Sequence, residues 1–246
     1  MADDAHNDPK KLASELLQNV TPHSADAPPA AGTNAATGDD ANATELVELY
    51  FQLEEPDERD AVFEQLAALD SPVVTEFFEA MMDRDEDEFM RNAAAVELAR
   101  RGHGGALAVL EEELRNPTEL LFFEQAVQVL VEVRGASMYE PLRALWESPD
   151  RDPAERRELM VGMELADPLR AMEDFAGFIT RIEDPRNLPD DQLEVAMMAF
   201  GRQGYTQVRP ALEALKSRIL AASFTDPDEQ TELAAFVQEG IDLLDD

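Results

Sequence analysis

Residues that commonly carry out chemistry are scarce in this chain of 246 residues. It has no cysteine and three histidines; His6 and His23 precede the helical part, and His103 lies alone in a glycine-rich turn. A zinc site needs three or four nitrogen, sulfur or carboxylate ligands together, and a serine nucleophile needs a neighbouring base. The sequence therefore predicts no catalytic residue, no metal site and no cofactor, and we expect the protein not to be an enzyme.

Two short stretches resemble ligand-binding loops without completing them. The acidic run at residues 83–88 spaces its acids as a calcium loop does, but such a loop needs glycine at its sixth position and glutamate at its twelfth. This chain has Glu88 and Ala94 there. The glycine-rich turn at residues 102–105 lacks the Lys-Ser/Thr ending of a phosphate-binding loop. We interpret both stretches as turns between helices.

Acidic residues dominate the composition, with 54 Asp and Glu against 20 Lys and Arg, for a net charge of −34. Nucleic-acid binding relies on Lys and Arg that release counterions from phosphates, so we expect no nucleic-acid partner. The excess acid has two interpretations. One is solubility, or adaptation to a salty cytoplasm; the other is a surface that steers a basic partner.

The beginning of the sequence, MADDAHNDPKK, is acidic and is followed by no long apolar run. It lacks the basic and apolar regions of a secretory signal, and no 18-residue apolar window suggests a membrane span. We therefore expect a cytoplasmic protein with no membrane partner.

The first 43 residues are predicted to form a disordered N-terminal arm. Residues 21–43 contain no Leu, Ile, Phe or Met and cannot bury enough apolar surface to offset the cost of ordering. Residues 10–20 could form a short amphipathic helix, either a fraying tail or a docking segment. Four apolar residues would share one face of that helix: Leu12, Leu16, Leu17 and Val20.

Helical spacing begins at Thr44 and continues to the end of the chain. Asp-Pro and Ser-Pro pairs indicate helix starts, and glycines after apolar runs indicate helix ends. No stretch alternates with a period of two, so no strand is predicted. The pattern predicts about six antiparallel helix pairs, over residues 44–69, 71–101, 104–133, 137–166, 168–203 and 205–244.

A unit of helix, Arg-Gly turn and helix occurs twice within residues 88–146. The turns Arg101-Gly102 and Arg134-Gly135 are 33 residues apart, a period typical of helical solenoids. The first unit has the pattern Arg91, Ala94, Leu98, Gly102, Ala106, Leu110 and Leu114. The second has Ala126, Leu130, Gly135, Tyr139, Leu142 and Leu145, and a looser copy has Ala196, Phe200, Gly204, Val208, Leu212 and Leu215.

These units resemble HEAT repeats in their short, phycobilisome-lyase-type form. The Trp, Leu-Gly and Tyr spacing of tetratricopeptide repeats is missing. The resemblance implies an all-α, right-handed α-solenoid over residues 44–246, in which the second helices of the pairs line a concave face. It specifies an architecture and says little about activity, because such repeats occur in many binding proteins and a few enzymes.

The function that we expect is a non-catalytic protein-protein interaction scaffold with acidic ridges, whose partner is another protein with a basic or mixed surface. The alternatives are an accessory lyase or chaperone-isomerase-type enzyme with an inter-repeat pocket, and a structural protein whose acidity serves hydration alone. The sequence leaves the oligomeric state open. The candidate partner-binding residues are a polar ladder and two aromatic residues: Asn92, Gln125, Gln128, Tyr139 and Trp146.

Overall fold

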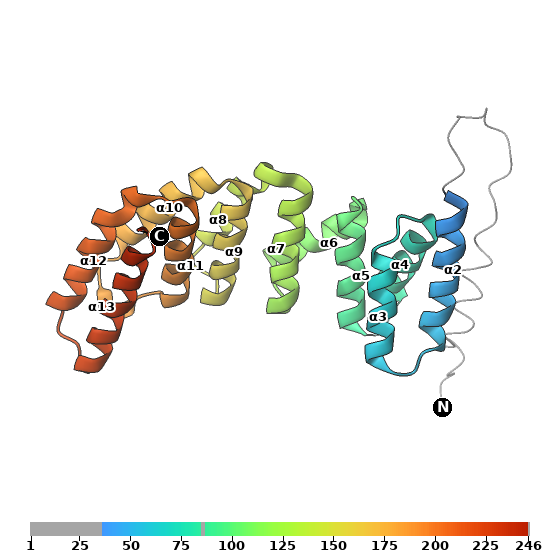
Figure 1. Cartoon of the computed structure of the whole chain (residues 1–246), viewed down its shortest axis with the longest axis horizontal. Coiled ribbons are helices and arrows are strands. Elements are labelled where there is room, and N and C mark those ends of the chain that lie inside the picture. The colour runs from blue at the N-terminus through green and yellow to red at the C-terminus, as the bar shows by residue number, and fades with distance from the viewer. Residues whose placement is uncertain (1–35, 85–86, 246) are drawn as a thin grey trace. The chain divides into compact units, whose positions relative to one another are not determined.

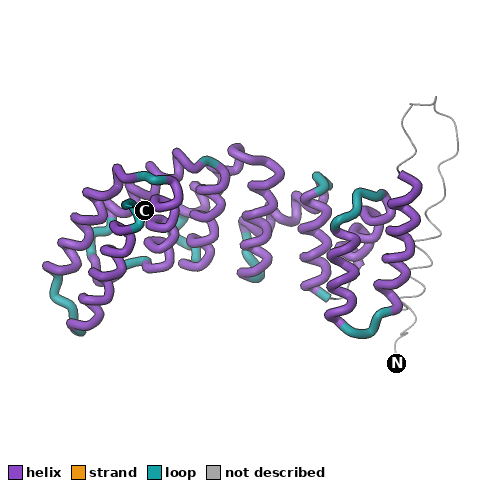
Figure 2. Tube along the Cα trace, viewed as in Figure 1, coloured by secondary structure: helices purple, strands orange, loops and turns teal. Residues whose placement is uncertain are grey.

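The structure, a computed structural model, describes residues 36–84 and 87–245 (Figures 1 and 2). Every regular element of these residues is helical and none is a strand, which confirms the all-α prediction. The possible amphipathic helix at residues 10–20 lies outside the described residues. The chain divides into two compact units, Met1–Ala106 and Leu107–Asp246.

In the described part of the chain, two α-helices lie in or overlap the residue range of each predicted pair. Their bounds are α2 Ala36–Gln52, α3 Pro56–Ala67, α4 Pro72–Arg84, α5 Glu88–Arg100, α6 Gly104–Arg115, α7 Leu120–Arg134, α8 Tyr139–Trp146, α9 Pro153–Ala166, α10 Pro168–Arg181, α11 Asp190–Gln203, α12 Arg209–Ala221 and α13 Pro227–Asp242. Short 3-10 helices η2 Gly135–Met138, η3 Pro185–Asn187 and η4 Thr206–Val208 lie between them.

Helix α2 begins at Ala36, before the expected helix start at Thr44, so residues 36–43 are helical and do not belong to a disordered arm. Tertiary contacts explain the difference. The Asp40 carboxylate accepts a hydrogen bond of 2.6 Å from the Ser71 hydroxyl, and Ala43 is fully buried. These contacts outweigh the weak local signal of an Ala- and Asp-rich stretch.

The predicted helix boundaries are correct at several caps. Asp152, Asp167 and Asp226 each precede a proline in the first turn, and each accepts a hydrogen bond from a backbone N–H of that turn. At the other end, Gly102 and Gly204 have φ of 78° and 59°, which residues with a side chain rarely adopt. The sequence signals for helix starts and ends therefore position these turns.

Aromatic side chains form much of the core of the first unit. Tyr50 of α2 and Phe77 of α4 meet edge to face with ring centroids 5.2 Å apart. Phe63 of α3 lies against Phe78 of α4 at 4.9 Å. Such pairs contribute about 0.5–1.5 kcal/mol beyond the burial of their area. Aromatic packing thus joins α2, α3 and α4.

Helix α9 is the central element of the second unit, where it contacts α7, α8, α10 and α11. A Cβ at Gly162 of α9 would collide with Val127 of α7 and Leu142 of α8, so only glycine allows this close approach. Farther along the chain, α12 contacts α10 and α13, and α13 also contacts α11. The contact of α11 with α13 creates the groove described below.

Three arginines, one in the first unit and two in the second, bind backbone carbonyl groups at the ends of earlier helices. The last carbonyl groups of a helix have no partner within that helix, and the arginine side chains donate hydrogen bonds to them. A cation at this end also interacts favourably with the helix dipole. The carbonyls lie 34–37 residues earlier in the sequence. The three pairs are Arg101 with Ala67, Arg151 with Leu114, and Arg218 with Ile182.

Candidate partner-binding groove

A groove of about 450 Å³ lies where α11 and α13 begin in the second unit. We call it the α11–α13 groove. It combines many carboxylates with three apolar side chains and one arginine. Its lining residues are Arg186, Leu188, Asp190, Asp191, Glu194, Glu229, Glu232, Leu233 and Phe236.

A repeated sequence motif positions the five carboxylates. Residues 189–194 read Pro-Asp-Asp-Gln-Leu-Glu and residues 227–232 read Pro-Asp-Glu-Gln-Thr-Glu, and each motif begins a helix. Acids in a first turn are favoured by the helix dipole. The glutamate that ends each motif lies three to four residues after a first-turn acid, so both project from the same side of the helix. This repetition is a signal that the sequence analysis missed.

The motif glutamines are structural. Gln192 is buried and accepts a hydrogen bond of 3.2 Å from the Trp146 indole N–H. The Gln230 amide donates to the carbonyls of Ile219 and Ala222, at the end of α12. Because these side chains fix the first turns of α11 and α13 to their neighbours, the groove carboxylates lie on a firmly held backbone.

Negative charge in the groove is not neutralised. Among the described residues, Asp190, Asp191, Glu194, Glu229 and Glu232 form no ion pair and no side-chain hydrogen bond that would offset their charge. The lining arginine, Arg186, is bound to Asp184 through two hydrogen bonds of 2.8 Å. This pairing lowers the pKa of Asp184 to about 2.

The pKa of Asp190 is raised from its ordinary value, first by partial burial and then by the negative charges of Asp191 and Glu229. Asp191 is on the same helix and Glu229 is on α13, so like charges face this carboxyl from both sides of the groove. A cationic group placed between α11 and α13 would offset the repulsion between these like charges and favour the ionised form of Asp190.

The apolar part of the groove consists of Leu188, Leu233 and Phe236, which are each half-buried. Together with the carboxylates they provide contacts for a ligand that has both apolar and cationic groups. Within the described residues, no group of three or more His, Cys, Asp or Glu side chains is arranged to hold a metal ion.

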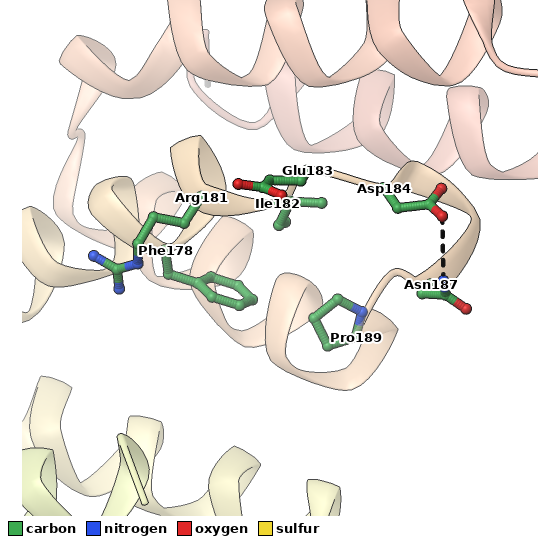
Figure 3. A pocket seen from close by; sticks show the side chains of 7 residues that line it. All are labelled: Phe178, Arg181, Ile182, Glu183, Asp184, Asn187 and Pro189. Carbon is green, nitrogen blue, oxygen red and sulfur yellow. Dashed lines mark hydrogen bonds between the residues drawn. The ribbon is translucent and has the colours of Figure 1, made fainter. Parts of the chain in front are cut away.

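A second pocket of about 260 Å³ lies beside the end of α10 and η3 (Figure 3). Its lining is Phe178, Arg181, Ile182, Glu183, Asp184, Asn187 and Pro189. The Asn187 amide donates to Asp184 at 3.3 Å, while the Arg181 guanidinium points away from that carboxylate (Figure 3). Because its low pKa keeps Asp184 ionised near neutral pH, this carboxylate is unsuited to act as a general acid.

Tyr139 and Trp146 were expected at a partner-binding surface, but the structure places both inside the second unit. Tyr139 is 0% exposed, and its hydroxyl donates a hydrogen bond of 2.7 Å to Asp174. Trp146 is 4% exposed, and its ring lies 5.9 Å from that of Phe178. The short helix α8 needs both rings to anchor it, and each polar tip has a partner. Neither side chain is available for contact with a partner in this structure.

The polar ladder remains a prediction. Asn92 on α5 and Gln125 on α7 are half-buried, and Gln128 on α7 is exposed. Asn92 belongs to the first unit, whereas the two glutamines belong to the second. Of the five expected contact residues, Gln128 has the most exposed side chain.

The turn residues considered in the sequence have structural roles. The His103 Nδ1 atom accepts a hydrogen bond of 3.3 Å from the Ala106 N–H at the start of α6, and its Nε2 atom is 3.1 Å from a Glu79 oxygen. In the acidic run, Asp87 caps α5 by accepting from the Phe89 N–H at 2.9 Å. Residues 85–86 of that run lie outside the described part.

No known protein family, curated protein or solved structure matches this chain. Among the described helices, none is both long enough and apolar enough to cross a membrane. A function for this chain must therefore be argued from the chemistry of its own residues, among which the α11–α13 groove gathers five carboxylates and three apolar side chains.

Proposed function

We propose that this protein is a non-catalytic protein-binding module whose partner is a protein with a basic or mixed surface. The observation that supports the proposal is the α11–α13 groove, where five carboxylates without cationic partners flank three apolar side chains. Buried or crowded charges of one sign are unfavourable unless a partner compensates them. A cationic partner surface supplies that compensation and also associates faster because of the attraction.

Several other acids of the second unit form ion pairs with arginines of the same chain, whereas exposed acids such as Glu173 and Glu213 form none among the described residues. Ion pairs join Arg134 with Glu111, Arg143 with Asp174, Arg170 with Glu140, Arg202 with Glu164 and Arg209 with Asp245. The groove differs because its one arginine is already bound to Asp184. Unlike single unpaired acids elsewhere, these five line one groove beside three apolar side chains, which favours a binding role over a role in holding helices together.

We also propose that the helix pairs stack as a HEAT-like, right-handed solenoid, with the acidic surface displayed on a rigid support. The three arginines that bind carbonyls one helix pair earlier support a repeated packing arrangement. In such an array each unit contacts its neighbours, so that the surface rather than a central cavity carries the function.

Affinity capture from source-cell lysate tests the proposed function. The bait is the full chain, compared with a groove variant carrying D190N, D191N, E194Q, E229Q and E232Q. The matched control variant carries E54Q, D150N, E173Q, E213Q and E239Q at exposed positions, so both variants lose five negative charges. We expect the native chain and the control variant to retain the same protein at low salt, and the groove variant to lose it.

Retention that does not weaken between about 0.05 and 0.5 M salt would contradict an electrostatic contact, because exposed charges are screened over this range. Equal retention by the native chain and the groove variant would place the binding surface elsewhere. If no bait retains a protein, the proposed function is wrong, and small-molecule binding becomes the question to test.

A further inference from the structure

We propose that the α11–α13 groove recognises a specific class of protein segment: one in which a large apolar side chain is flanked by Lys or Arg on both sides. The inference rests on the proposed function and adds the chemistry of the ligand. The ligand class follows from the positions of the groove's carboxylates and of its apolar side chains.

The carboxylates come from both walls of the groove. Asp190, Asp191 and Glu194 belong to α11, and Glu229 and Glu232 belong to α13. Both sets of carboxylates line one groove of about 450 Å³, so the two walls lie close together. The negative charge of Glu229 contributes accordingly to the raised pKa of Asp190. A protein segment that lies between the two walls therefore meets acids on both sides. This arrangement favours Lys or Arg on both sides of the large apolar side chain of that segment.

The apolar side chains of the groove indicate where the large apolar side chain of the ligand would bind. Leu188 precedes α11, whereas Leu233 and Phe236 lie three residues apart on α13 and share a face of that helix. At about 450 Å³ the groove lies at the lower end of ligand-pocket sizes, which run from roughly 300 to 1,000 Å³. It therefore suits one large side chain, such as Leu or Phe, rather than a whole helix.

Charge excludes the other ligand classes. Phosphate-bearing ligands, including nucleic acids and anionic lipid surfaces, would be repelled by five carboxylates. A bare metal ion has no suitable cluster of ligands among the described residues. An uncharged apolar peptide would fill the apolar part but leave the carboxylates without partners, so it should bind less tightly.

Fluorescence anisotropy with a labelled synthetic peptide, KKLFKKLLKK, tests the inference on the full chain. One comparison peptide replaces every Lys with Glu, and a second replaces every Leu and Phe with Ser and keeps the Lys residues. Changing the peptide leaves the protein fold untouched, so loss of binding cannot arise from unfolding. We expect the first comparison peptide not to bind and the second to bind at least about tenfold more weakly, a loss of about 1.4 kcal/mol.

The groove and control variants then locate the site. The groove variant should lose at least about tenfold in affinity for the peptide, while the control variant, with the same net charge, should lose less than about threefold. Equal losses in both variants would show attraction to the overall charge and overturn the inference. Binding of the Ser-containing peptide at full strength would overturn the role of the apolar anchor.

The proposed function and this inference fail in different ways. If the full chain captures a cellular protein through the groove but does not bind the peptide, the proposed ligand class is wrong. The proposal of a protein-binding module is still supported in that case. If the peptide binds in the groove and no cellular protein is retained, the groove has the stated chemistry but the proposed function is not supported.

Discussion

Two clusters of charged residues in the second unit have opposite organisation. Around α8, acids and arginines balance: Arg143 Nε lies 2.8 Å from Asp174, and Arg170 bonds to Glu140 and lies 4.3 Å above the Tyr139 ring. At the start of α11 and α13, five carboxylates face each other with one arginine that is already bound to Asp184.

The difference indicates which charges serve the fold. The ion pairs around the buried ring, Arg143 with Asp174 and Arg170 with Glu140, join α8 to α10. Unbalanced charges in the groove repel one another in the folded state and so weaken it slightly. Removing a charge should therefore have opposite effects on stability in the two clusters.

The largest expected effect is in the balanced cluster. Tyr139→Ala should lower the free energy of unfolding by about 3–5 kcal/mol, because it empties a fully buried aromatic site. Tyr139→Phe should cost about 1–2 kcal/mol, since it removes the hydrogen bond to Asp174 and keeps the ring. Urea unfolding followed by circular dichroism measures both. A loss below 1 kcal/mol for Tyr139→Ala would contradict the burial of the ring.

Asp174→Asn should have the next largest effect in the same cluster. The neutral amide would still accept from Tyr139 but would weaken the attraction to Arg143, so we expect a loss of about 1–2 kcal/mol. Glu173→Gln is the matched control, because Glu173 is exposed on the same helix and forms no ion pair among the described residues. If both changes had the same effect on urea unfolding, the cluster would not be a stabilising one.

Much of the helical framework was predictable from sequence because its signals are local. A capping Asp before a proline identified the starts of α9, α10 and α13, and Gly204 identified the end of α11. The start of α2 was missed because it depends on contacts such as Asp40 with Ser71, which no local pattern reveals. The packing role of Gly162 depends on its neighbours Val127 and Leu142, which no local sequence pattern reveals.

The candidate site was harder to predict. Tyr139 and Trp146 are aromatic side chains with a polar tip, a property that suits burial with a bonded tip as well as contact at a binding surface. The overall acidity of the sequence does not single out the groove acids, because it does not reveal that the starts of α11 and α13 meet. The two Pro-Asp-acid-Gln-x-Glu motifs were a visible signal for similar helix starts.

In the groove, Asp190→Asn should stabilise the protein near neutral pH, by less than ~1 kcal/mol because the site is largely exposed. The folded-state pKa of Asp190 is raised above its ordinary value of 3.8, so the folded protein holds this proton more tightly than the unfolded chain. The free energy of unfolding therefore falls as the pH rises from the unfolded-state pKa of Asp190 to its folded-state pKa. Above the folded-state pKa, the full loss of stability from the ionised Asp190 is present.

The increase in the free energy of unfolding caused by Asp190→Asn should consequently be present at pH 7 and disappear as the pH falls below about 4. Thermal unfolding of the variant and the native chain across pH measures it. A destabilising effect of Asp190→Asn at pH 7 would mean that the carboxylate has an internal partner, and the contrast between the clusters would fail.

Salt should produce the smallest effect, a few tenths of a kcal/mol for exposed charges. The Debye length falls from about 10 Å at 0.1 M salt to about 3 Å at 1 M, so repulsion between the two groove walls should be screened across this range. The five-site groove variant should be more stable than the native chain at low salt, and the difference should shrink as salt rises.

The five-site control variant separates local from global repulsion, because it carries the same net charge on dispersed sites. Its stability gain at low salt should be smaller than that of the groove variant, since its carboxylates come from different helices and loops rather than from one groove. Identical gains in thermal unfolding would assign the repulsion to net charge alone. A larger gain for the groove variant would show that these carboxylates repel one another locally, as a site awaiting a cationic partner requires.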